Sequence, residues 1–352
     1  MYNIFGDVMI NIYDFTFSKL EEYLVLNKEK KYRARQIFDW LYQKRIDNYE
    51  AMTNLNESTL KLLKENTYFG TLEKVLVSES SDGTVKYLFK LNDGQLIETV
   101  LMSHNYGYSV CITSQVGCNM GCEFCASGLL KKQRNLTSGE MLLQVLMVEK
   151  LFKKRISHIV IMGIGEPFDN YYHVRDFLTN ANDHRGLEIG ARHMTVSTCG
   201  IVPKIKEFAL EKTQINLAIS LHAPNNEIRD KIMPINKAYP IEDLIESIKY
   251  YHSKSLRRIT IEYILLKDFN DQKEHALELA KLLKGLNVYV NLIPYNVVLE
   301  KPFQRSDKKT MDDFFKVLKA NNINATLRKE QGHDIDAACG QLRSGYNKGV
   351  VR

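Results

Sequence analysis

Three cysteines fall within eight positions of the segment GCNMGCEFCASG, residues 117–128. Cys118, Cys122 and Cys125 are half of the chain's six cysteines, so three incidental thiols explain the grouping poorly. At these gaps, thiolates can bind one soft metal centre from a single loop. Structural zinc takes four ligands, usually as two pairs, and no second pair follows. The pattern favours a 4Fe–4S cluster with one iron open to a cofactor or substrate, and zinc stays as the second interpretation.

Three other residues could do chemistry, and each has a plainer alternative. Cys339 lies in DIDAACGQL, beside acidic residues and a glycine, and by itself is more typical of a small buried side chain. Cys111 ends a predicted strand ahead of the cysteine motif, and alone it is also typical of a core thiol. Glu98 interrupts an apolar strand, where it either faces solvent or is a buried base with a raised pKa.

The composition fits a globular protein of 352 residues with a formal net charge of +6. No apolar run reaches the roughly 20 residues that cross a bilayer, and the first residues do not resemble an export signal. We therefore expect a cytoplasmic protein without structural disulfides and with no membrane partner. Residues 28–45 carry seven basic side chains among aromatic ones, which fits either a nucleic-acid contact or a solvated helix face.

The elements that position these residues follow from hydrophobic periodicity. Residues 18–66 have helical spacing, whereas residues 71–113 alternate as strands with SDG and NDG turns between them. From 118 onward, apolar strands alternate with amphipathic helices. The strands are predicted at 158–163, 193–198, 215–220, 259–266, 288–293 and 323–328, and the helices include 138–152, 203–212, 241–252, 272–284 and 309–320. This order predicts an α/β fold with a parallel sheet, either an open (β/α) barrel or a doubly wound sheet.

Polar segments follow the predicted strands, at the sheet edge where chemistry collects in such folds. They read GIGEP, STCG, SLHAP and PYN. Together with CITSQVGCNMGCEFCASG, RNLTSGE, AISLHAPNNEIRDKIMPINKAYPI and DIDAACGQL, they stand in the order found in the RlmN/Cfr family of radical S-adenosylmethionine (SAM) rRNA adenine methyltransferases. The resemblance covers roughly residues 20 to 345.

The resemblance implies a role for each candidate residue. Cys118, Cys122 and Cys125 would hold a 4Fe–4S cluster whose fourth iron binds SAM. Cys339 would be the methyl carrier, Cys111 the cysteine that resolves the RNA adduct through a transient disulfide, and Glu98 the proton acceptor. Two SAM molecules would be used per turnover. The residues that match the family's SAM contacts are Gly165, Glu166, Ser197, Ser220, Leu221, His222 and Asn296.

The resemblance also implies an architecture and a substrate. We expect a partial (β/α)6 radical SAM barrel over residues 104–334. A helical RNA-binding domain over 1–70 and a β extension over 71–103 would precede it, and a segment over 335–352 would carry the methyl-accepting cysteine. Pro167 in GIGEP favours the RlmN type, which methylates adenine carbon-2 of 23S rRNA and of some tRNAs, over the Cfr type, which methylates carbon-8. Electrons would come from a flavodoxin or ferredoxin type of donor. A metal-containing RNA-binding protein without activity, or a radical SAM enzyme without a methyl-cysteine, are the alternatives.

Overall fold

The computed structural model describes residues 9–342, so the first eight positions of the expected 1–70 domain and the last ten of the 335–352 segment lie outside the described residues. The helices are α1 (Phe17–Leu26), α2 (Arg33–Phe38), α3 (Glu57–Asn66), α4 (Ser138–Phe152), α5 (Tyr171–Asn182), α6 (Val202–Phe208), α7 (Asn226–Ile232), α8 (Ile241–Ser255), α9 (Lys273–Leu283) and α10 (Lys308–Ala320). The helices expected from periodicity are confirmed, and α5 and α7 are additional.

Ten strands form one sheet in the order β14-β13-β12-β11-β10-β9-β6-β5-β4-β3. The extension consists of β3 (Glu73–Glu79), β4 (Val85–Lys90) and β5 (Leu96–His104), which pair antiparallel with one another, and β5 pairs antiparallel with β6 (Gly107–Ile112), the first strand of the barrel. The rest are β9 (His158–Ile161), β10 (Met194–Thr198), β11 (Asn216–Ser220), β12 (Ile259–Leu265), β13 (Val288–Pro294) and β14 (Ala325–Leu327). From β6 through β14 every pairing is parallel.

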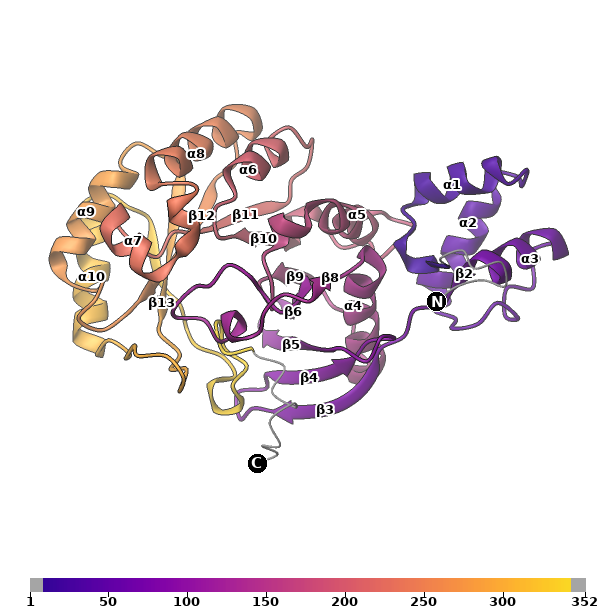
Figure 1. Ribbon diagram of the computed structural model, residues 1–352, viewed down its shortest axis with the longest axis horizontal. Coiled ribbons are helices and arrows are strands. Elements are labelled where there is room, and N and C mark those ends of the chain that lie inside the picture. Colours follow the sequence, from indigo (N-terminus) through magenta and orange to yellow (C-terminus); the bar gives the residue numbers. More distant parts are fainter. Residues whose placement is uncertain (1–8, 343–352) are drawn as a thin grey trace.

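The parallel strands follow one another in chain order without a reversal, which decides between the two predicted folds. A doubly wound sheet reverses its order at a switch point, whereas a barrel does not. The sheet is open, because β14 is an edge strand and the other edge continues into β5, β4 and β3. The helices α4, α5, α6, α8, α9 and α10 follow the outside of the curved sheet (Figure 1), whereas the short α7 packs beside the cysteine-bearing loop through Ile228 and Ile232. The expected partial barrel with an antiparallel extension is confirmed.

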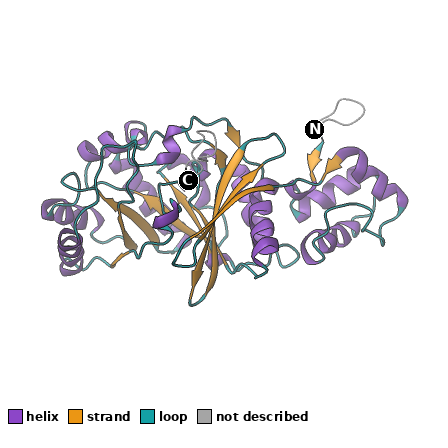
Figure 2. Ribbon diagram, turned by 90° about the horizontal axis from the view of Figure 1, so that it is seen from below, coloured by secondary structure: helices purple, strands orange, loops and turns teal. Residues whose placement is uncertain are grey.

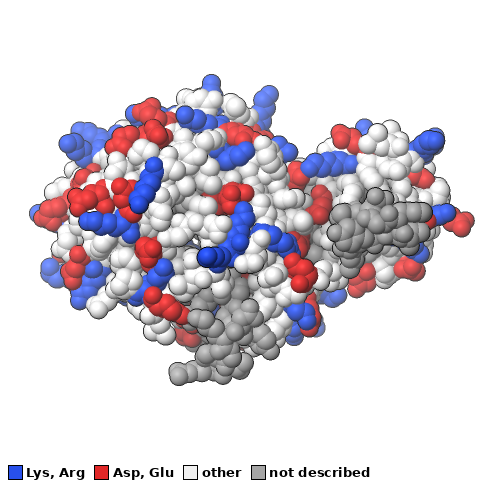
Figure 3. All heavy atoms as spheres, in the orientation of Figure 1, with Lys and Arg blue, Asp and Glu red and all other residues white. Residues whose placement is uncertain are grey.

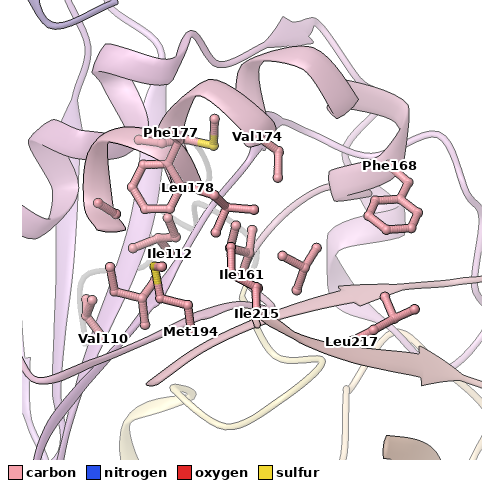
Figure 4. Packing of buried hydrophobic residues seen from close by; sticks show 14 of the residues in the cluster. Val110, Ile112, Ile161, Phe168, Val174, Phe177, Leu178, Met194, Ile215 and Leu217 are labelled. Carbon is pink, nitrogen blue, oxygen red and sulfur yellow. The ribbon is translucent and has the colours of Figure 1, made fainter. Parts of the chain in front are cut away.

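The hydrophobic core lies between the sheet and these helices. In Figure 4, Phe177 of α5 points toward Ile112 of β6 and Leu178 toward Ile161 of β9, and all four side chains are buried. A side chain of this size contributes about 1.5–3 kcal/mol when it is fully buried. The helix α4 begins with a capping box, in which Thr137 accepts from the Glu140 amide at 3.2 Å and Glu140 accepts from the Thr137 amide at 2.9 Å.

The N-terminal helices stand at one end of the sheet (Figure 2). The short strands β1 (Ile10–Asn11) and β2 (Thr67–Tyr68) pair and bring the two ends of this helical unit together. Side chains connect it to the core: Asp14 accepts from the Gly139 amide at 2.7 Å, and Arg45 pairs with Glu149 at 2.6 Å. Among residues 9–342 no helix is both long and apolar enough to cross a membrane.

Candidate active site

The loop that carries the cysteine motif follows β7 (Gln115–Val116) and returns to pair with it through β8 (Arg134–Asn135). Gly117 allows this return, since it has φ +75 and a Cβ there would lie 2.3 Å from the Lys131 carbonyl oxygen. The folded loop places Cys118, Cys122 and Cys125 in the wall of one cavity.

This cavity, called the cluster cavity below, has a volume of about 890 Å³ including its open mouth. It lies where the strands β9 to β12 end, as parallel α/β folds lead one to expect. It brings together most of the predicted site residues. Those that line it are Cys118, Cys122, Cys125, Gly165, Glu166, Ser197, Ser220, His222 and Cys339.

The three motif thiols line one cavity from a single loop, and three thiolates are a donor set that a 4Fe–4S cluster can use. Burial raises the pKa of Cys118 to about 11 and that of Cys122 well above its usual range, so cationic iron would be needed to favour the thiolates. Within residues 9–342, no three His, Cys, Asp or Glu side chains are arranged to hold one metal ion. Each cysteine of a 4Fe–4S cluster binds a separate iron, so its ligands do not converge on one point.

The GIGEP loop borders the cluster cavity and is held by Gln115, which the sequence analysis did not single out. The Glu166 amide donates to the Gln115 side-chain oxygen at 2.9 Å. The buried Glu166 carboxylate accepts from the amides of Phe168 at 2.9 Å and Cys199 at 2.7 Å. Burial raises the pKa of Glu166 despite these hydrogen bonds. The carboxylate thereby connects the ends of β9 and β10.

His222 has both a structural role and a place in the cavity wall. Its Nδ1 accepts from the Ile264 amide at 3.0 Å, which leaves the ring proton on Nε2. The ring packs edge-on against Phe124, with 4.8 Å between the centroids. Burial, and then the nearby Arg229, lower the pKa of His222 to about 3. The imidazole is therefore neutral at physiological pH.

Arg229 fixes the strand ends beside the cavity, although the sequence analysis did not select it. The fully buried guanidinium donates to the carbonyls of Cys199 at 2.6 Å, Leu221 at 3.2 Å and Ser220 at 3.3 Å. Among the described residues it has no carboxylate partner within ion-pair distance. Leu221, a predicted SAM contact, is buried in the main core, and its amide donates to the Glu262 carbonyl at 3.1 Å.

A second cavity, called the C-terminal cavity below, adjoins the first and has a volume of about 690 Å³. Cys111 and Asn296 line it, so the structure places Asn296 here and not in the lining of the cluster cavity. Arg328 and Cys339 line both cavities. The sulfur-bearing side chain of Cys339 therefore lies between the cluster loop and Cys111.

Hydrogen bonds across the open side of the barrel hold the segment that carries Cys339. The Asn296 side chain donates to the Cys339 carbonyl at 3.1 Å, and the Ala126 amide of the cluster loop donates to the Gly340 carbonyl at 2.8 Å. Earlier in the same segment, the Gly332 amide donates to the Asp82 carboxylate at 2.8 Å. The segment thus connects the cluster loop with the turn between β3 and β4.

Cys111 is deeply buried, and burial, followed by the proximity of Cys339, raises its pKa to about 12. Arg328 has the opposite effect on Cys111. The Arg328 guanidinium donates to the Cys339 sulfur at 3.1 Å. Arg328 ends a predicted strand, so the rule that polar residues at strand ends carry chemistry would have selected it.

Glu98 is buried, 4% exposed, which excludes the solvent-facing alternative. It lies on the same side of β5 as Val100 and Met102, which line the C-terminal cavity, although Glu98 is not in the lining of either cavity. Lys86 pairs with Glu98 at 3.6 Å and also donates to the Asp336 carbonyl at 3.1 Å. This lysine therefore connects Glu98 with the Cys339 segment.

The basic side chains divide into paired and unpaired ones. On the face shown in Figure 3, basic and acidic groups are interspersed. Near the cluster loop, Lys132 pairs with Asp169 and Arg134 with Glu140, which leaves the exposed Lys131. In the N-terminal unit, Lys44 pairs with Asp39 and lies 3.5 Å from the Trp40 ring centroid. Three exposed basic side chains of this unit have no ion pair within residues 9–342, namely Lys28, Lys30 and Arg35. They are called the tip residues below.

Comparison with known proteins agrees with this geometry. Residues 112–280 match the model of the Radical SAM superfamily, and residues 10–68 match that of the ribosomal RNA large subunit methyltransferase N-terminal domain. Over 333 residues the chain is 59% identical to a probable dual-specificity RNA methyltransferase RlmN from Acholeplasma laidlawii, an alignment that covers 95% of this chain and 98% of the relative. A protein of the same name from Spiroplasma citri is 55% identical over 347 residues, covering 98% and 100%.

A solved structure agrees over the same extent. The crystal structure of a radical SAM methyltransferase from Sphaerobacter thermophilus superposes with a TM-score of 0.89 and 42% sequence identity. The superposition covers 95% of this chain and 99% of that one. The similarity therefore includes the N-terminal helices, the extension and the barrel.

Proposed function

Because the chain belongs to the RlmN family of radical SAM RNA methyltransferases, we propose that it methylates carbon-2 of adenosine in two RNAs. These are one adenosine in the peptidyl-transferase region of 23S rRNA and the adenosine 3′ of the anticodon in some tRNAs. The observation that carries methyl transfer is the placement of Cys339 between the cluster loop and Cys111, and Pro167 in GIGEP supports carbon-2 over carbon-8. Two relatives named as dual-specificity RNA methyltransferases support the choice of two RNA substrates.

The residues of the cluster cavity fit a 4Fe–4S cluster and SAM, which the family implies. We propose Cys118, Cys122 and Cys125 as the cluster ligands, with SAM beside Gly165, Glu166, Ser197, Ser220 and His222. When bound, the cluster and two SAM molecules per turnover would supply a methyl group and a carbon-centred radical. The barrel's task is then to keep water out and to hold Cys339 within reach of both.

The chain's own residues would divide the work among three positions. Cys339 accepts the methyl group on its sulfur and carries it to the adenine ring. Glu98 takes the proton that leaves the ring carbon, after its ion pair with Lys86 has opened. The Cys111 thiolate then attacks the Cys339 sulfur and a disulfide forms, while the bond between that sulfur and the transferred carbon breaks; its electron pair stays on the carbon, which takes up a proton and becomes the methyl group. A thiol reductant must reduce this disulfide before the next turnover.

The RNA would reach the open side of the barrel, with its target base turned out of the stack. The tip residues and Lys131 are the exposed cations best placed to contact phosphates, because the other basic side chains discussed above already have acidic partners. We also propose a flavodoxin or ferredoxin type of electron donor and a cytoplasmic location, where such RNAs are found.

Mass spectrometry of product nucleosides tests the site of methylation. Anaerobically reconstituted enzyme should convert 23S rRNA and tRNA fragments to 2-methyladenosine; 8-methyladenosine as the product would overturn the proposal. Cys339→Ala should lose methylation while keeping its iron and its SAM cleavage. Cys199→Ala removes another buried free thiol, which lines the cluster cavity but not the C-terminal cavity. Because the Cys199 backbone amide and carbonyl make the hydrogen bonds to Glu166 and Arg229, this variant should still gain the methyl mark on Cys339.

A further inference from the structure

The contact between Arg328 and Cys339 has no role in the function proposed above. Arg328 directly follows β14, and its guanidinium borders both cavities. Its hydrogen bond to the Cys339 sulfur is 3.1 Å long, which is within range for a sulfur acceptor. A cation at this distance stabilises a thiolate much more than a neutral thiol.

We propose that Arg328 is a positioning residue that fixes the Cys339 sulfur at the junction of the two cavities and favours its thiolate form. The inference rests on the proposed function in one respect, namely that Cys339 accepts a methyl group. The guanidinium would then increase the fraction of Cys339 able to react and would hold the sulfur toward the cluster cavity.

The surrounding charges support this assignment. Glu262 is buried, and its carboxylate accepts from the Asn291 side chain at 2.8 Å but does not lie within ion-pair distance of Arg328. Among the described residues, the Cys339 sulfur is therefore the acceptor for this guanidinium. The largest effect on the pKa of Arg328 comes from Cys339, which raises it. Burial acts in the opposite direction, and Glu262 and Cys111 raise this pKa further.

Several titratable groups face this junction from the elements around it. They are Cys111 on β6, Cys125 on the cluster loop, Glu262 on β12, His104 at the end of β5, and Glu330, which pairs with Arg305. Arg328 is the cation among the groups that line both cavities. It therefore offsets the negative charge that would develop on Cys339.

In methyl transfer to Cys339, each proton and electron pair has a defined destination. Cys339 loses its thiol proton to solvent, and the thiolate sulfur attacks the methyl carbon of SAM. The new sulfur–carbon bond forms as the old one breaks, and its electron pair stays on the sulfur of the departing cofactor product. Cys339 becomes a neutral thioether, so its interaction with the Arg328 guanidinium weakens after methyl transfer.

Thiol reactivity tests the inference without any methyltransferase assay. Full-length protein is treated with iodoacetamide between pH 5 and 10, a range of about five units that spans the ordinary thiol pKa. The rate at Cys339 is read by mass spectrometry from the unmodified peptide only, so any methylated fraction does not enter. Arg328→Gln should lower the rate at neutral pH about tenfold and move the midpoint of the pH profile upward by about one unit.

Two further variants make the result decisive. Arg328→Lys retains the charge and should keep the midpoint close to that of the unchanged protein, which also covers the case in which Arg328→Gln fails to fold. Lys329→Gln removes an exposed neighbouring charge and should leave the profile unchanged. A midpoint that does not move in Arg328→Gln overturns the inference.

Failure of the proposed function gives a different result. If Cys339 of the unchanged, cluster-containing protein never gains the mass of one added methylene group in the presence of SAM, the methyl-carrier role fails, whatever the alkylation profile shows. If it gains that mass and Arg328→Gln retains the unchanged profile, only the role of Arg328 fails.

Discussion

Replacing Gly165 with alanine should separate SAM binding from the rest of the fold. Gly165 has φ +106, where side chains are strained, and an added Cβ would lie 2.6 Å from the Gln115 Cβ and 2.9 Å from its backbone nitrogen. Carbon atoms in van der Waals contact are about 3.5–4.0 Å apart. Either the GIGEP loop or Gln115 must therefore move.

The size of the effect follows from these two costs. The positive φ costs an alanine about 1–2 kcal/mol, and overpacking costs about 1–3 kcal/mol more. Gln115 also accepts the hydrogen bond from the Glu166 amide, so its movement would displace the cavity wall at Glu166. If about 2 kcal/mol of this cost falls on the bound state, the affinity for SAM decreases about thirtyfold.

The assay is calorimetric titration of anaerobically reconstituted protein with SAM, together with thermal unfolding. Gly94→Ala is the matched control, because Gly94 has φ +84 but no heavy atom within 4 Å of an added Cβ. This control should lose stability through backbone strain alone and bind SAM normally. If Gly165→Ala binds SAM as tightly as the unchanged protein, the close approach to Gln115 does not shape the site.

Three other perturbations test separate parts of the structure. Since buried His222 has a pKa of about 3 when folded and 6.5 when exposed, stability should fall by about 1.4 kcal/mol per pH unit as the pH drops below 6.5. Denaturant titrations of His222→Gln should show a shallower slope, and an equal slope would contradict the neutral imidazole. Gln144→Ala removes hydrogen bonds of 2.9 Å to both the amide and the carbonyl of Thr113, and should lower the free energy of unfolding by about 2–4 kcal/mol. The exposed Gln304→Ala should change it little, and a comparable loss there would argue against this account. Charge reversal of the tip residues should weaken RNA binding and reduce its salt dependence by about three phosphate contacts, with the iron content unchanged; unaltered affinity at physiological salt would remove them from the RNA surface.

Local pattern was enough to predict the order of strands and helices. The six strand predictions after residue 118 each coincide with a strand from β9 to β14, because alternating apolar runs and helical periodicity are properties of neighbouring residues. The turns with Gly83 and Gly94 were predictable for the same reason, since both adopt positive φ between antiparallel strands.

Side-chain environment was less accessible to sequence reasoning. From the sequence alone, the Glu98 side chain could be either solvent-facing or buried. The pairing of β4 with β5 buries it beside Lys86. Leu221 and Asn296 follow strands as expected, yet one packs in the core and the other lies in the second cavity. A side chain's direction depends on the twist and register of strands distant in sequence.

The sequence by itself determined the cysteine motif, because its three residues lie within one loop and need only local geometry to line one cavity. Only the tertiary structure decided how Cys111, Arg328 and Cys339 meet. These residues come from β6, from the end of β14 and from the segment after it, and they meet because the sheet curves and that segment crosses its open side. Contacts between residues far apart in the chain depend on how the whole sheet closes, and periodicity along the sequence carries no record of that.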